Sequence, residues 1–154
     1  MSPASIQVPD ALVARMSDAA EDAYPEECCG LLIGRRQETG DFTVTEAVPS
    51  PNVAGGDHAD SFEVSPQLRF NLMRRLGDGP EQIIGHYHSH PGHPGEPSAR
   101  DLEMAFEPDM VWLIIAVENG LAQPPRAHIV DTDTAGQAGG FREIELHASP
   151  QPTP

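Results

Sequence analysis

The segment from His88 to Asp101 constrains this chain more than any other, because it sets two histidines, a serine and an aspartate in the pattern H-x-H-x7-S-x2-D. In an extended strand, residues i and i+2 project from the same side, so the side chains of His88 and His90 can reach one point. The prolines and glycines between them and Asp101 predict a loop at 89–97. In a fold that fits this pattern, the chain leaves the strand through this loop and then returns, so that Asp101 lies near the two histidines.

These side chains are suited to holding a metal ion. Two imidazoles and one carboxylate are ligands that zinc takes in open catalytic sites, where water holds the fourth position. We therefore predict that His88, His90 and Asp101 bind one zinc ion per chain. Zinc lowers the pKa of bound water from about 16 to about 7, and Glu27, further upstream, supplies a carboxylate that could move protons for that water. The pattern predicts a small zinc hydrolase.

Each part of this pattern also has a simpler interpretation. Histidines in loops commonly just face solvent. Ser98 and Asp101 match a helix capping box, with the serine as N-cap and the acid three residues later. The metal interpretation therefore depends on the two parts occurring together, with Glu27 in addition.

Three further histidines need separate treatment. His86 lies on the same side of the predicted strand as His88, but three histidines in a row would crowd one ion. We expect His86 to have a packing or hydrogen-bonding role. His93 is in the middle of the loop, where it could touch substrate, and we expect it to face solvent instead. His58 lies in a loop with no recognisable partner.

The charge of the chain excludes two classes of partner. Nine basic residues against 24 acidic ones give a formal net charge of −15, which disfavours binding to nucleic acid and to anionic membrane surfaces. The length of 154 residues fits one domain with a single core. We expect that domain to span residues 1–148 and residues 149–154 to form a disordered tail.

The two cysteines, Cys28 and Cys29, are adjacent, which is poor geometry for a structural disulfide and predicts a reducing compartment. The first residues do not resemble a signal peptide, and no apolar run approaches the length of a membrane span. A cytoplasmic protein is expected. No basic neighbour in the sequence would lower the pKa of either thiol, so both are expected to be buried and inert.

Hydrophobic patterns along the chain predict a mixed β-sheet with helices packed on it. Helices are expected at 9–23, at 65–76, where Ser65-Pro66 opens the segment, and at 98–106. The run Val111–Val117 is fully apolar and predicts a central strand. The other strands are expected at 29–35, 41–48, 83–88, 127–130 and 141–146, with a loop at 52–60.

Three of these segments together resemble the JAMM motif of the JAB/MPN-type zinc metalloproteases. They are Glu27-x-Cys29-Gly30, His88-Ser89-His90-Pro91 and Pro97-Ser98-x-x-Asp101. Residues 24–32 are similar to the first strand of the small bacterial members, and Pro51-Asn52, followed by Phe62 and a helix, is similar to their second conserved region. The resemblance runs from about residue 8 to about residue 130, and the combined motif is specific.

The resemblance implies an α/β fold like that of cytidine deaminases. Its three-layer (α+β) arrangement has helices on both sides of a mixed sheet. The resemblance also implies hydrolysis of peptide or isopeptide bonds. By position, His88, His90 and Asp101 would hold zinc, and Glu27 would act as general base and acid for the zinc-activated water. Ser98 would help to stabilise the oxyanion.

The resemblance also implies a class of substrate. Eukaryotic members grip ubiquitin with inserted segments for which this chain is too short. The small prokaryotic members include enzymes that act on the C-terminal tails of ubiquitin-like sulfur carriers, so a ubiquitin-like or sulfur-carrier tail is the expected partner. The alternative is a non-catalytic JAB/MPN interaction module, whose mark would be a missing ligand. A base deaminase is disfavoured, because the chain has no Cys-x-x-Cys.

Overall fold

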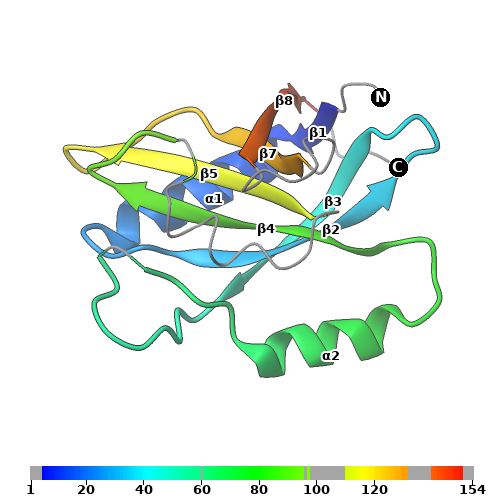
Figure 1. Ribbon diagram of the computed structural model, residues 1–154, viewed down its shortest axis with the longest axis horizontal. Helices are drawn as coiled ribbons and strands as arrows, with labels where there is room; N and C mark the ends of the chain where they lie inside the picture. The colour runs from blue at the N-terminus through cyan, green and yellow to red at the C-terminus, as the bar shows by residue number, and fades with distance from the viewer. Residues whose placement is uncertain (1–4, 60, 96, 98–109, 132–139, 151–154) are drawn as a thin grey trace.

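The fold is built on one eight-stranded mixed sheet that curls until its strands form a ring. The computed structural model describes residues 5–59, 61–95, 97, 110–131 and 140–150. The strands follow the order β4-β2-β3-β1-β8-β7-β5-β6, and β4 also pairs with β5, which closes the ring and leaves β6 attached outside it (Figure 1). The strands are β1 (Ser5–Pro9), β2 (Cys29–Arg36), β3 (Phe42–Ser50), β4 (Gln82–Pro91), β5 (Val111–Glu118), β6 (Leu121–Ala122), β7 (Arg126–Asp131) and β8 (Gly140–Ser149).

Helix α1 (Asp10–Ala23) packs on the inner face of this curled sheet. Its apolar residues Leu12, Met16 and Ala20 recur every fourth position, which places them on one side of the helix, where all three are buried. They join a core to which β2 contributes Leu32 and β4 contributes Tyr87. Among the described residues, this core is larger than the second cluster, which lies on the other face of the sheet.

Helix α2 (Pro66–Leu76) packs on the opposite face (Figure 1). Its N-cap Ser65 accepts a hydrogen bond from the backbone N–H of Leu68 at 3.2 Å. Leu72 packs with Leu31 of β2, whereas the next residue of that strand, Leu32, belongs to the inner core. Because successive strand residues point to opposite faces, the two helices lie on different sides of the sheet.

The two described helices match the predictions at 9–23 and 65–76. Each of the six expected strands is also present, as β2, β3, β4, β5, β7 and β8. The expected α/β architecture with a mixed sheet is confirmed, but the three-layer description fits only roughly. The sheet is curled into a barrel-like ring, and the described part of the chain contains two helices. The helix expected at 98–106 lies outside the described residues.

Two strand ends differ from the expectations, and two strands were not expected. We expected the strand to end at His88 and the loop to contain His90. Strand β4 instead continues to Pro91, so both histidines lie inside the strand. Strands β1 and β6 were not predicted. Strand β8 runs to Ser149, the first residue of the expected tail. Neither of the two described helices reaches the apolar length that crossing a bilayer requires.

Candidate metal centre and active site

His88 and His90 lie on β4, where neighbouring strands hold the backbone on both sides. Cys29 of β2 pairs with His88 on one side, and Ile114 of β5 pairs with it on the other. His88 is fully buried and His90 nearly so. Their side chains project from the same face, as their spacing predicts, and the two Nε2 atoms are 3.0 Å apart. Two imidazoles therefore present their distal nitrogens to one small space.

The orientation of His90 is set by its other ring nitrogen. Nδ1 of His90 is 3.0 Å from the backbone carbonyl of Pro94. A carbonyl oxygen can only accept a hydrogen bond, so Nδ1 carries the proton and donates it. In the neutral ring this leaves the lone pair on Nε2, the atom that faces His88. Metal-binding histidines are commonly oriented by such a hydrogen bond to a carbonyl.

The third member of the cluster is Glu27, which lies just before β2 and is 6% exposed. Its backbone is held at both ends. The N–H of Glu27 donates to the carbonyl of His58 at 2.7 Å, and the side chain of Asn52 donates to the carbonyl of Glu27 at 3.2 Å. The ligand atoms of Glu27, His88 and His90 all lie within 4.8 Å of one another. A buried carboxylate thus sits beside the two imidazoles.

Ser89 fixes this carboxylate-bearing segment to β4. Its side chain points away from the histidines on either side, because neighbouring strand residues alternate. The backbone N–H of Cys28 donates to Oγ of Ser89 at 2.8 Å, and the N–H of Ser89 donates to the carbonyl of Cys28 at 3.1 Å. Ser89 is fully buried. The residue between the two histidines therefore sets where Glu27 stands relative to them.

Aromatic rings form one wall of the cluster. The ring of Phe62 stacks on His88, with centroids 4.0 Å apart and planes inclined by 16°. Trp112 on β5 meets His86 edge-on at 4.3 Å and His88 at 5.7 Å. His86 is buried between Phe62 and Trp112 and packs against both, as expected. These rings restrict the rotation of His88 and exclude water from one side of it.

The remaining histidines of the motif region have different surroundings. His93 is exposed, as expected, and the centroid of its ring is 6.5 Å from that of the His90 ring. His58, for which no partner was expected, bonds the carbonyl of Ala54 through Nε2 at 2.7 Å. Its own carbonyl holds Glu27. The loop at 52–60 is therefore part of the site's framework, and neither its histidine nor Asn52 was assigned a role from the sequence.

The two thiols face opposite sides of the chain. Cys28 packs against the inner core, and Sγ of Cys29 lies 3.8 Å from the carbonyls of Pro51 and Glu63. Both cysteines are free. Burial raises the pKa of the Cys29 thiol to about 12 and also raises that of Cys28, so both are protonated at neutral pH. The expectation of inert thiols agrees with this.

The donor set fits a zinc ion. Zinc–nitrogen bonds of about 2.0–2.1 Å at a tetrahedral angle separate two nitrogens by about 3.3 Å, close to the 3.0 Å between His88 and His90. Imidazole nitrogen and carboxylate oxygen are both zinc ligands. The structure brings Glu27, His88 and His90 together, whereas Ser98 and Asp101 lie outside the described residues.

A family model of prokaryotic homologs of the JAB domain matches residues 9–129. This chain belongs to that family. A JAB1/MPN domain protein from Archaeoglobus fulgidus has a related fold, with a TM-score of 0.54 and 19% identity over 93% of this chain and 98% of that one. The architecture described above is therefore the JAB/MPN fold.

Three relatives of this JAB-family chain are more similar in sequence. A desampylase of Haloferax volcanii is 32% identical over 105 residues, which are 68% of this chain and 73% of the relative. The CysO-cysteine peptidase of Mycobacterium tuberculosis is 27% identical over 108 residues, 70% of each chain. A protein of Desulfitobacterium hafniense with a solution structure is 27% identical, with a TM-score of 0.78 over 95% of this chain and 94% of that one.

Proposed function

We propose that this protein is a zinc-dependent metallopeptidase that hydrolyses a peptide or isopeptide bond at the C-terminal tail of a ubiquitin-like or sulfur-carrier protein. One observation carries the proposal: a buried carboxylate and two buried imidazoles converge within 4.8 Å in a JAB-family chain. Imidazole nitrogen and carboxylate oxygen are both ligands that zinc takes, so their convergence in one small space favours a bound cation over a purely structural role.

His88 and His90 would hold the ion through Nε2, and Asp101 would supply the third ligand, as the family resemblance implies. When bound, zinc lowers the pKa of water and polarises a carbonyl group. Glu27 takes the proton from the attacking water and later delivers it to the leaving amine. Its segment is fixed to β4 through Ser89, so the carboxylate needs no rearrangement to do so. Ser98 would donate a hydrogen bond to the developing oxyanion.

The substrate class follows from the relatives. One is named for desampylation and another as a CysO-cysteine peptidase, and we extend that type of substrate, a ubiquitin-like or sulfur-carrier protein, to this chain. A Gly-Gly tail is extended and has no side chains, so it could enter a narrow groove and pair with a strand edge. We also propose that residues 1–148 form the catalytic domain and that the protein works in the cytoplasm.

The test uses purified protein, a panel of ubiquitin-like carriers with extended C-termini, and mass spectrometry of the products, with and without a chelator. Wild type should contain one zinc ion and release the extension, and chelation should abolish release. Glu27→Gln should keep zinc and lose turnover by at least about 10²-fold, as expected for a lost general base. Glu26→Gln changes the exposed neighbouring acid and is the matched control.

Two outcomes would contradict parts of the proposal. Loss of zinc from Glu27→Gln would make Glu27 a ligand instead of the base, and full zinc retention in Asp101→Asn would remove Asp101 from the ligand set. A zinc-loaded wild type that cleaves none of the carriers would refute the substrate class. If wild type binds a carrier but contains no zinc and forms no cleavage products, the non-catalytic interaction module is supported instead.

A further inference from the structure

A buried histidine outside the metal cluster, His128, holds the loop that follows β4. His128, on β7, is 3% exposed, and its Nε2 is 3.0 Å from the backbone carbonyl of Gly95. The two residues are 33 positions apart in the chain. Because the carbonyl can only accept, Nε2 of His128 is the donor. This contact ties the loop to a strand on the far side of β5.

Gly95 is also held by close packing. It is buried, and a Cβ atom at this position would lie 3.3 Å from Cδ of Arg126 and 3.7 Å from the carbonyl of Ile114. The stem of Arg126 therefore lies close to the loop backbone, and a Cβ at position 95 would require this side chain to move by a few tenths of an ångström. Gly95 sits between β5 and the side chains of β7.

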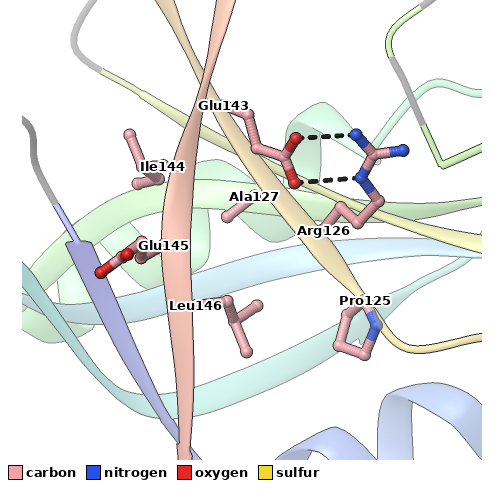
Figure 2. A pocket seen from close by; sticks show the side chains of 7 residues that line it. All are labelled: Pro125, Arg126, Ala127, Glu143, Ile144, Glu145 and Leu146. Atoms are coloured by element: carbon pink, nitrogen blue, oxygen red, sulfur yellow. Dashed lines mark hydrogen bonds and ion pairs between the residues drawn. The ribbon is translucent and has the colours of Figure 1, made fainter.

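Arg126 is itself kept in place by Glu143 on β8. Figure 2 shows the two parallel hydrogen bonds, from Nε to Oε2 at 3.0 Å and from Nη2 to Oε1 at 2.7 Å. The pair lines an open pocket of about 380 Å³ over β7 and β8. Hydrogen bonding by Arg126 lowers the pKa of the Glu143 carboxyl. Glu143 is the register partner of His128 in the β7–β8 pair, so its side chain lies on the same face of the sheet as those of Arg126 and His128.

The loop links the His128 contact on β7 to the metal cluster on β4. The carbonyl of Pro94 accepts from Nδ1 of His90, and the carbonyl of the next residue, Gly95, accepts from His128. One peptide unit separates the two acceptors, so a shift of Gly95 away from β7 moves the acceptor of His90 with it. Three residues after Gly95, the chain reaches Ser98.

We propose that His128 is a positioning residue for the metal centre: by holding the Gly95 carbonyl, it keeps the Pro94 carbonyl on Nδ1 of His90 and so presents Nε2 of His90 for metal binding. The inference rests on the proposed zinc site and deepens it. Residues that orient metal-binding side chains in this way typically change metal affinity by about 10–100-fold when they are replaced.

The test compares two neutral amides at position 128. In His128→Gln, the side-chain nitrogen lies as many bonds from Cα as Nε2 of histidine does and can still donate to Gly95. In His128→Asn, it is one bond short. We expect zinc affinity, measured by chelator competition, to fall about tenfold or more in the Asn variant and to stay within about threefold of wild type in the Gln variant. His147→Asn, on the exposed face of β8, is the control.

A second measurement needs neither a metal ion nor a substrate. Nitrogen-15 spectra of the histidine rings in metal-free wild type should show His90 with its proton on Nδ1 and His128 with its proton on Nε2. In His128→Asn, the His90 ring should populate both tautomers. A proton on Nδ1 of neutral His128 in wild type would overturn the proposal, as would equal zinc affinities for the Asn and Gln variants. A substrate panel that yields no cleavage would refute only the proposed activity.

Discussion

Replacing Ser89 by alanine separates the positioning of Glu27, the proposed general base, from metal binding. The fully buried hydroxyl of Ser89 accepts the Cys28 N–H at 2.8 Å, and alanine leaves that donor without this partner. An unsatisfied buried donor costs about 1–3 kcal/mol. For a domain of this size, about 2 kcal/mol corresponds to a melting temperature lower by about 4–8 °C. Glu27, one residue before Cys28, loses part of its attachment to β4 at the same time.

We therefore expect Ser89→Ala to lower kcat by about 10–100-fold, because small displacements of a catalytic group are costly, while zinc content and KM stay near those of wild type. His88 and His90 keep their positions, since β2 and β5 flank the strand. Ser89→Thr retains the hydroxyl and is the matched variant. The test measures the melting temperature by differential scanning calorimetry, the zinc content of each variant, and kcat and KM by steady-state kinetics. Unchanged kcat in a Ser89→Ala protein with a lowered melting temperature would refute the positioning argument.

Three shorter predictions concern the surroundings of the site. The raised pKa of Cys29 means that thiolate forms only as the pH rises towards 12, so iodoacetamide should label it in folded protein far more slowly than in urea at pH 8, as read by mass spectrometry. Gly85→Ala should lower stability by about 3 kcal/mol in urea titrations, because a Cβ there would overlap the backbone of Val111. Phe62→Ala should release zinc about tenfold faster to a chelator than Phe62→Leu, since it removes the ring stacked on His88.

The sequence predicted the elements that have a strong local pattern. Val111–Val117 is apolar throughout and forms the buried part of strand β5, which ends at the exposed Glu118. The spacing of His88 and His90 placed both rings on one face of β4. Pro91 misled the prediction of where β4 ends. Proline lacks the N–H that a ladder uses, yet it can still occupy the last position of a strand, where it pairs with Val117.

The framework of the site could not be predicted because its contacts join residues far apart in the sequence. Ser89 bonds Cys28 across 61 positions, and His128 bonds Gly95 across 33. No periodicity or local motif marks such pairs, since only the closed sheet brings them together. Strand β1 escaped prediction for the same reason, because its five residues carry little pattern and both of its partners are distant.

The parallel pairing of β1 with both β3 and β8 has a consequence for biosynthesis. Residues Ser5–Pro9 are translated well before Glu145–Ser149, one of their two neighbouring strand segments. Until then the nascent chain carries an open strand edge, which is the kind of surface that chaperones protect and aggregates recruit. The ring of strands can therefore close only after Glu145–Ser149 have been translated, and the sheet that carries His88 and His90 is complete only then.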